Sequence, residues 1–320
     1  TVTAELAVHR AGKTRNPLDL SRSCGTSSSG SAAAVAAYMV PIALSSQTAS
    51  STIRPASYCG IYGFKPSFGL LPRTAMLKTT DSLDTVGMMA RSVADLKLMF
   101  EVMRVRGENY PIVEREINLS KRRLPRSSKW KIGVLEGPKS YLEDDHAKDG
   151  INKISQILSD AGCEIVNFKL PNLFDEAHQI HSKIYNKCLA YYFKTEWNSR
   201  KADFSDIMSQ MIENGIKVGK EEYVEALTSQ TKLAESLGRQ IGNVDVIICP
   251  SAASEAPLGM HSVDVEDHTL IWTMCYLACL SVPILSGGNG LPIGVQVVAP
   301  RFNDYIALDF AEYLTGLMKK

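Results

Sequence analysis

The sequence predicts an α/β fold in which a mixed central β-sheet carries helices on both faces. A strand-like run at 131–137 (KIGVLEG), helical apolar spacing over 147–161 and a second run at 163–171 (CEIVNFKLP) form a β-α-β pattern. Long helical segments fill about 173–240. After them come the apolar, β-rich runs VDVIICPSA, VPILSG and LPIGVQVVAP, which are typical of strands buried on both faces.

The first part of the chain predicts one helix and then short strands. Residues 31–40 (SAAAVAAYMV) contain strong helix formers and stop at Pro41, which a helix cannot easily include. PIAL (41–44) and TIRPASYCGIYGF (52–64) are strand-like runs interrupted by glycines.

Two further helices and one loop complete the prediction. RSVADLKLMFEVM (91–103) begins with Ser92 and Asp95 at the spacing of a capping box, and DYIALDFAEYLTGLM (304–318) predicts a C-terminal helix. The polar, basic stretch 105–130 predicts an exposed loop. The length of 320 residues, without an internal repeat, allows one domain over 1–320.

Composition excludes several functional classes. With 35 Lys and Arg against 34 Asp and Glu, no global field favours nucleic acid or an anionic membrane. The seven cysteines show no CxxC or Cys/His spacing, so neither a disulfide framework nor a zinc site is indicated. The N-terminus has no apolar signal-peptide region, and the longest apolar stretches fall short of a membrane span. We therefore expect a cytoplasmic protein.

Hydroxyl side chains crowd two stretches, GTSSSGSAAAVAA (25–37) and SSQTASSTIRPASYCG (45–60). The first has the glycine spacing of a phosphate-binding loop, but Ser31 stands where that loop needs lysine, and Ser31 fits better as a helix cap. A reactive serine needs a base, and no G-x-S-x-G elbow is present. His178 and His181 lie three apart without a nearby acidic ligand motif, so we expect surface or groove-lining histidines rather than metal ligands. Lysine with a lowered pKa is the obvious alternative base.

These stretches, together with DSLDTVGMMARSVADL, DVIICPSAASEAPLG and LPIGVQVVAPRFND, resemble the amidase signature family. The motifs occur in the family's order, and the resemblance covers essentially the whole chain. The pattern is most similar to stand-alone amidases of the TQTAGSxIRPAxYCG subtype. The resemblance implies the amidase-signature fold and hydrolysis of carboxamides without a metal or organic cofactor.

The family's Ser–cis-Ser–Lys triad assigns roles by position. The resemblance implies that Ser51 is the nucleophile and that Ser27, on a cis peptide, is the bridging serine that relays a proton. It places the oxyanion hole on the backbone N–H groups of Thr48, Ala49, Ser50 and Ser51.

Two departures from the family pattern bear on activity. Ser50 replaces the glycine that usually precedes the nucleophile, which would cost free energy if this position needs a positive φ. The family's catalytic lysine lies upstream, in a segment that the printed chain does not contain, so we expect an N-terminally truncated form. Lys13 is too close in sequence to Ser27 to replace it, and Lys65 fits a structural role better.

We therefore expect an amide hydrolase acting through a serine acyl-enzyme, present here as a fragment. The alternatives are a catalytically inactive homologue and the glutaminase (A) subunit of a tRNA-dependent amidotransferase. The expected partner is a small-molecule amide, with no nucleic acid and no membrane, and a homodimer is allowed. A truncated N-terminus would also expose apolar surface and a sheet edge.

Overall fold

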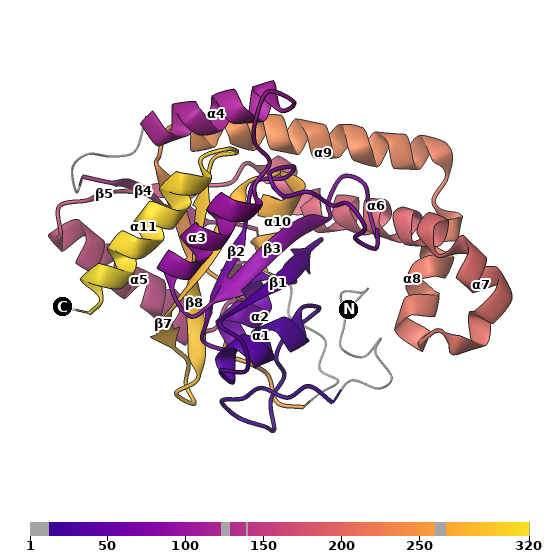
Figure 1. The fold of residues 1–320 in the computed structure, drawn as a ribbon, viewed down its shortest axis with the longest axis horizontal. Helices are drawn as coiled ribbons and strands as arrows, with labels where there is room; N and C mark the ends of the chain where they lie inside the picture. The colour runs from indigo at the N-terminus through magenta and orange to yellow at the C-terminus, as the bar shows by residue number, and fades with distance from the viewer. Residues whose placement is uncertain (1–12, 123–128, 139, 260–266, 320) are drawn as a thin grey trace.

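The computed structural model describes residues 13–122, 129–138, 140–259 and 267–319, and within them one eight-stranded mixed sheet organises the chain (Figure 1). The strand order is β1-β3-β2-β7-β8-β6-β4-β5. Strand β4 pairs in parallel with β5 and β6, and the remaining pairs are antiparallel. The strands are β1 (Ile42–Gln47), β2 (Tyr62–Lys65), β3 (Thr85–Ala90), β4 (Lys131–Glu136), β5 (Glu164–Lys169), β6 (Val246–Pro250), β7 (Ala278–Ser286) and β8 (Pro292–Ala299).

Helices cover both faces of the sheet, as predicted. They are α1 (Ser29–Ala36), α2 (Ile53–Tyr58), α3 (Val93–Met103), α4 (Pro111–Arg122), α5 (Asp145–Asp160), α6 (Ala177–Tyr192), α7 (Lys194–Arg200), α8 (Asp206–Lys217), α9 (Lys220–Ile241), α10 (Thr269–Met274) and α11 (Asp304–Leu317). Alternate residues of one strand enter two different cores: Val246 and Ile248 pack with α3, α5 and α11, whereas Ile247 and Cys249 pack with α6, α9 and α10. This alternation explains why the central strands are apolar throughout.

The predicted β-α-β unit is confirmed. Strands β4 and β5 are parallel, and α5 connects them with its apolar stripe facing the sheet. The Asp144 side chain caps α5 by accepting a hydrogen bond from the Ala147 N–H at 2.7 Å. The Ser92 cap predicted for α3 is also present, with Asp95 N–H donating to its hydroxyl at 3.1 Å.

Two of the predicted secondary-structure elements are wrong. The stretch 52–64, expected to be a strand, begins with helix α2. All six residues of α2 are buried, so its sequence shows no amphipathic period. Its N-terminus is satisfied by Gln47, whose Oε1 accepts hydrogen bonds from Thr52 and Ile53 N–H at 2.9 and 3.1 Å. Within the predicted loop 105–130, residues 111–122 form α4, in which Ile117 is buried in the core and Val113 packs against it. Residues 123–128 of that loop lie outside the described part.

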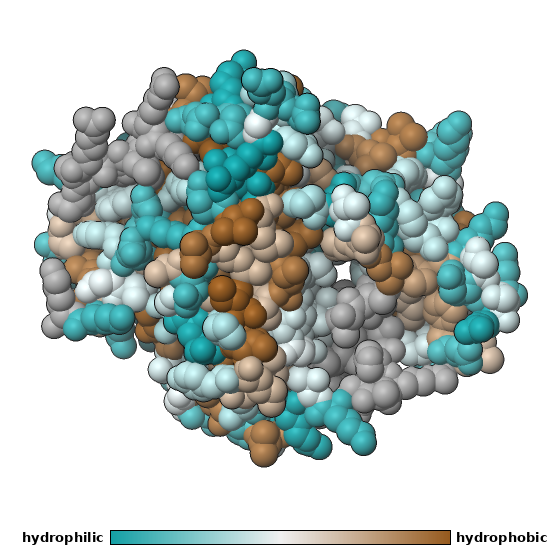
Figure 2. All heavy atoms as spheres, viewed as in Figure 1, coloured by the Kyte–Doolittle hydropathy of each residue, from teal (hydrophilic) through white to brown (hydrophobic). Residues whose placement is uncertain are grey.

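Strand β1 occupies one edge of the sheet, next to α1. Figure 2 shows apolar side chains gathered over the middle of one face, where α3 lies in Figure 1. Leu98 and Val102 of α3 are 64% and 75% exposed there. In the described residues, none of the helices combines the length and apolarity that crossing a bilayer requires.

Candidate active site

Ser51 lies in the short loop that leaves the edge strand β1 and enters α2. The loop, residues 48–51, is buried or half-buried, and Ser51 is 5% exposed. Close packing holds α2 against the sheet: a Cβ on Gly63 would come within 2.5 Å of the Ala56 Cβ, and a Cβ on Gly87 within 2.5 Å of the Thr52 Oγ1. Because neither glycine has a side chain, Thr52, which follows Ser51, packs directly against β2 and β3.

A second loop brings Ser27 beside this one. The Ser28 N–H donates a hydrogen bond to the Ser51 carbonyl at 3.2 Å, so the two serine-rich stretches meet although they lie far apart in the sequence. The Ser28 hydroxyl lies 3.2 and 3.3 Å from the Ser46 carbonyl and N–H, at the outer edge of β1. The Thr26–Ser27 peptide is cis, as the resemblance implies, and Ser27 is 8% exposed.

Ser31 is not the helix cap. Helix α1 begins at Ser29, so Ser31 lies in its first turn. Its hydroxyl donates a hydrogen bond to the Leu44 carbonyl at 2.7 Å. The hydroxyls of Ser28 and Ser31 thus form hydrogen bonds with backbone groups of the edge strand β1. The sequence alone could not predict these bonds, because it does not show which strand lies beside α1.

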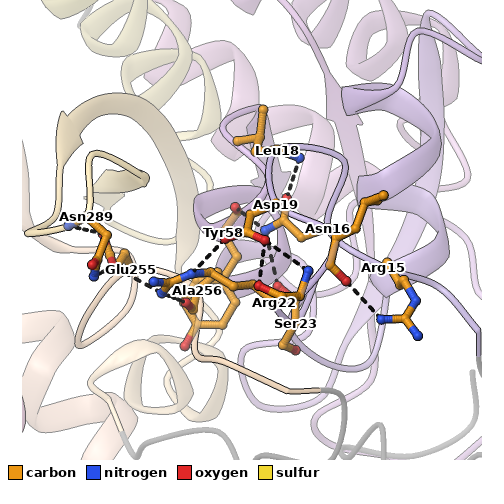
Figure 3. A network of polar contacts seen from close by, with 12 residues as sticks. Arg15, Asn16, Leu18, Asp19, Arg22, Ser23, Tyr58, Glu255, Ala256 and Asn289 are labelled. Atoms are coloured by element: carbon orange, nitrogen blue, oxygen red, sulfur yellow. Dashed lines mark hydrogen bonds and ion pairs between the residues drawn. The ribbon is translucent and has the colours of Figure 1, made fainter.

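A polar network fixes the segment that leads into the Ser27 loop (Figure 3). The Asn16 side chain donates to the carbonyls of Ser23 at 3.2 Å and Tyr58 at 2.8 Å. The Arg22 guanidinium donates to the Glu255 carboxylate at 3.1 Å and to the Ala256 carbonyl at 2.6 Å. This segment is thereby tied to α2 and to the loop after β6.

The backbone N–H groups of the loop are not used within the described structure. No residue that the structure describes accepts a hydrogen bond from the N–H of Thr48, Ala49, Ser50 or Ser51. Ser50 is also absent from the residues with positive φ, so its side chain causes no left-handed strain there. Buried N–H groups are nearly always paired in proteins, and a row of unpaired ones can bind an anion.

The loop's carbonyls, by contrast, all have donors. His181 Nε2 lies 3.0 Å from the Thr48 carbonyl, Thr273 Oγ1 donates to the Ala49 carbonyl at 2.7 Å, and Arg54 N–H donates to the Ser50 carbonyl at 3.0 Å. His181 is buried, not a surface or groove-lining residue, and burial lowers its pKa to about 4.

Asp84 holds the loop from another side. Its carboxylate accepts hydrogen bonds from the Thr48 hydroxyl at 2.8 Å and from the N–H and hydroxyl groups of Thr79 and Thr80 at 2.7–2.9 Å. Asp84 is 1% exposed. Asp84 thus ties the turn at Thr79 and Thr80 to Thr48, a contact that nothing in the sequence indicates.

A cavity of about 630 Å³ lies beside Ser27. Ser27 and Ser28 line it together with Leu44 of β1, whereas Ser51 does not. Lys65 has a structural environment: its buried ammonium donates to the carbonyls of Pro66 and Leu277, and burial lowers its pKa. Among the described residues, no cluster of His, Cys, Asp and Glu could hold a metal ion.

Comparison with known proteins places the chain in a family. Curated relatives include the Glutamyl-tRNA(Gln) amidotransferase subunits A of Treponema denticola, 27% identical over 94% of this chain and 70% of the relative, and of Thermotoga maritima, 29% identical over 91% and 67%.

Solved structures share the fold. The peptide amidase of Stenotrophomonas maltophilia matches with a TM-score of 0.78 at 23% identity, over 100% of this chain and 70% of that one. A crystal structure described as an amidase matches with a TM-score of 0.85 at 22% identity, over 98% and 72%. A family model named Amidase matches residues 4–308. The chain therefore belongs to the amidase family of amide-hydrolysing enzymes.

Proposed function

We propose that this protein hydrolyses the C–N bond of a small-molecule carboxamide, with Ser51 as the nucleophile. The Ser51 Oγ attacks the carbonyl carbon, and the carbonyl oxygen becomes an oxyanion held by N–H groups of residues 48–51. Ser27 relays the Ser51 proton to the leaving nitrogen. Water then attacks the acyl-enzyme and releases the acid, while Ser51 regains its proton.

The row of N–H groups in loop 48–51 carries this proposal. Four consecutive buried or half-buried amides lack an acceptor among the described residues, and they flank the hydroxyl that would attack. Fixed N–H donors stabilise an oxyanion strongly, and each is typically worth about 2.7–4 kcal/mol in the transition state. Buried N–H groups without an acceptor cost free energy, unless a reacting group binds there and accepts their hydrogen bonds.

The proton acceptor beyond Ser27 stays a prediction. The family resemblance implies that this acceptor is a lysine upstream of the Ser27 loop. The cavity of about 630 Å³ beside Ser27 is large enough to admit such a side chain.

A fluorophosphonate probe tests the nucleophile. It should label the full-length protein at Ser51, and Ser51→Ala should abolish labelling. Ser27→Ala should slow it by about 10²-fold or more, the usual contribution of a proton relay. Ser199→Ala is the control, since Ser199 is exposed on α7 and its hydroxyl donates to the Thr195 carbonyl of the same helix. Labelling at another residue, or none in the folded full-length protein, would refute the assignment; the latter would favour an inactive homologue.

A second candidate function follows from the relatives named above. Glutamine would be the amide if the chain works as a glutaminase subunit inside an amidotransferase. Glutamine hydrolysis that appears only when partner subunits are added would establish this function. Turnover of simple amides by the isolated full-length protein would establish a stand-alone amidase, and light scattering of the same sample would test for a homodimer.

A further inference from the structure

Three consecutive carbonyl groups in loop 48–51 are bonded to donors outside it. The Thr48 carbonyl accepts from His181 on α6, the Ala49 carbonyl from the hydroxyl of Thr273 on α10, and the Ser50 carbonyl from the backbone N–H of Arg54. Two of these three donors are side chains from distant parts of the sequence.

Peptide planarity turns each of these bonds into control over the next N–H group. The carbonyl of one residue and the N–H of the following residue belong to one rigid plane and point in opposite directions. A donor that fixes the Thr48 carbonyl therefore fixes the Ala49 N–H, and a donor on the Ala49 carbonyl fixes the Ser50 N–H. The Ala49 and Ser50 N–H groups are thus oriented by hydrogen bonds to the carbonyl on the opposite side of the same peptide plane.

We propose that His181 and Thr273 are positioning residues, which hold the Ala49 and Ser50 N–H groups toward the site of the oxyanion. This inference rests on the proposed function of loop 48–51. Neither side chain has to touch the substrate for this role. Their effect is to stop the two peptide planes from rotating, so that no reorganisation is needed when charge develops on the reacting oxygen.

The environment of His181 suits this role. A carbonyl only accepts hydrogen bonds, so the ring must carry a proton on Nε2 to bind Thr48. Burial, the largest influence on the pKa of His181, brings it to about 4, so at neutral pH the ring is uncharged and Nδ1 carries no proton. The ring also lies 5.7 Å from that of Tyr185, one turn along α6. His181 is therefore a neutral, buried donor whose Nε2–H has one fixed direction.

Thr273 is oriented by Gln47. The Gln47 Nε2 donates to the Thr273 Oγ1 at 3.0 Å. The single hydroxyl proton of Thr273 then has two carbonyl acceptors in reach, and Ala49 at 2.7 Å is much nearer than Thr269 at 3.4 Å. The orientation of the Gln47 amide is fixed in turn, because its Oε1 accepts from the N–H groups of Thr52 and Ile53. The same side chain thus caps α2 behind Ser51 and sets the direction of the Thr273 hydroxyl.

The test measures how fast a fluorophosphonate reacts with Ser51 in the full-length protein, separating the limiting rate from the probe's affinity. The probe's phosphoryl oxygen gains charge as Ser51 Oγ bonds to phosphorus and fluoride leaves, so it senses the oxyanion site. His181→Met and Thr273→Val remove the donors, and each should lower the limiting rate about ten- to a hundredfold with little change in affinity. His181→Gln and Thr273→Ser keep a donor and should stay within a few-fold of the wild type.

Gln179→Ala, at an exposed position of α6, controls for general effects of altering this helix and should react like the wild type. Two-dimensional ¹⁵N NMR of histidine-labelled protein should show His181 as the neutral Nε2–H tautomer at pH 7. If the wild type is not labelled at Ser51, the proposed function fails and this inference falls with it. If the wild type is labelled but His181→Met and Thr273→Val react at its rate, the inference alone is overturned. If His181→Met does not fold, Thr273→Val against Thr273→Ser decides the matter.

Discussion

Replacing Gly215 by alanine should destabilise the protein, because α6 and α8 cross there with no room for a side chain. A Cβ on Gly215 would overlap the backbone carbonyl of Asn186 and lie 3.0 Å from the Ala190 Cβ. Carbon atoms pack at about 3.5–4.0 Å and the Asn186 carbonyl is the closest obstacle, so the two helices must separate by roughly 1–1.5 Å. Backbone cannot rotate away as a side chain can, so we expect a cost near the upper end of overpacking, about 3 kcal/mol. Alanine gains about 1 kcal/mol over glycine in a helix, which leaves a net loss of about 2 kcal/mol.

Gly238→Ala on α9 is the matched control. Gly238 is exposed, and its Cβ would meet nothing within 4 Å, so the gain in helix propensity of about 1 kcal/mol should appear alone. Urea unfolding followed by circular dichroism gives both free energies of unfolding. The two variants should shift the midpoint in opposite directions without a change in slope. If Gly215→Ala stabilises the protein as much as Gly238→Ala, the close crossing of α6 and α8 is wrong.

Three further predictions follow from buried polar and titratable groups. Asp267→Ala should lower the free energy of unfolding by about 3–5 kcal/mol in urea titrations, since it leaves the buried Arg54 guanidinium without the carboxylate 2.7 Å away; a loss under 1 kcal/mol would contradict this. Folding keeps His181 neutral, so the unfolded chain binds more protons between pH 6.5 and about 4, and stability should fall as the pH drops through that window. The fall attributable to His181 is about 3 kcal/mol, and His181→Gln should remove it from the pH profile of unfolding; an unchanged profile would rule this out. All seven cysteines are buried, so a thiol reagent should titrate them only after denaturation, and rapid reaction of the native protein would disprove that burial.

The predicted elements were correct where a local period or cap defines them. Helix α5 shows an apolar stripe, α3 carries its own Ser92 cap, and the buried strands are runs of β-branched residues. Helix α2 was missed because it is too short and too buried to show a period, and because its cap comes from Gln47 on the preceding strand. Helix α4 was missed because the sequence around it is polar, although Val113 and Ile117 connect it to the core.

The approach of the two serine loops was predicted only through the family resemblance. Spacing alone could not show that Ser28 bonds to Ser51, nor that Ser31 serves β1 rather than capping α1. Both depend on β1 lying beside α1, a tertiary fact. The roles of Ser51 and Ser27 remain predictions, whereas their proximity is a feature of the structure.

The groups that shape loop 48–51 are the least predictable part of the site. His181 and Thr273 lie 133 and 224 positions from the loop residues they bind, on helices whose own sequences show nothing unusual. A histidine among polar residues is usually at the surface, and only the position of α6 makes this one a donor to Thr48. It follows that two chains with identical serine motifs could differ greatly in rate if their α6 or α10 differed at these positions. The serine motif supplies the N–H groups, but side chains on α6 and α10 determine the direction of these groups.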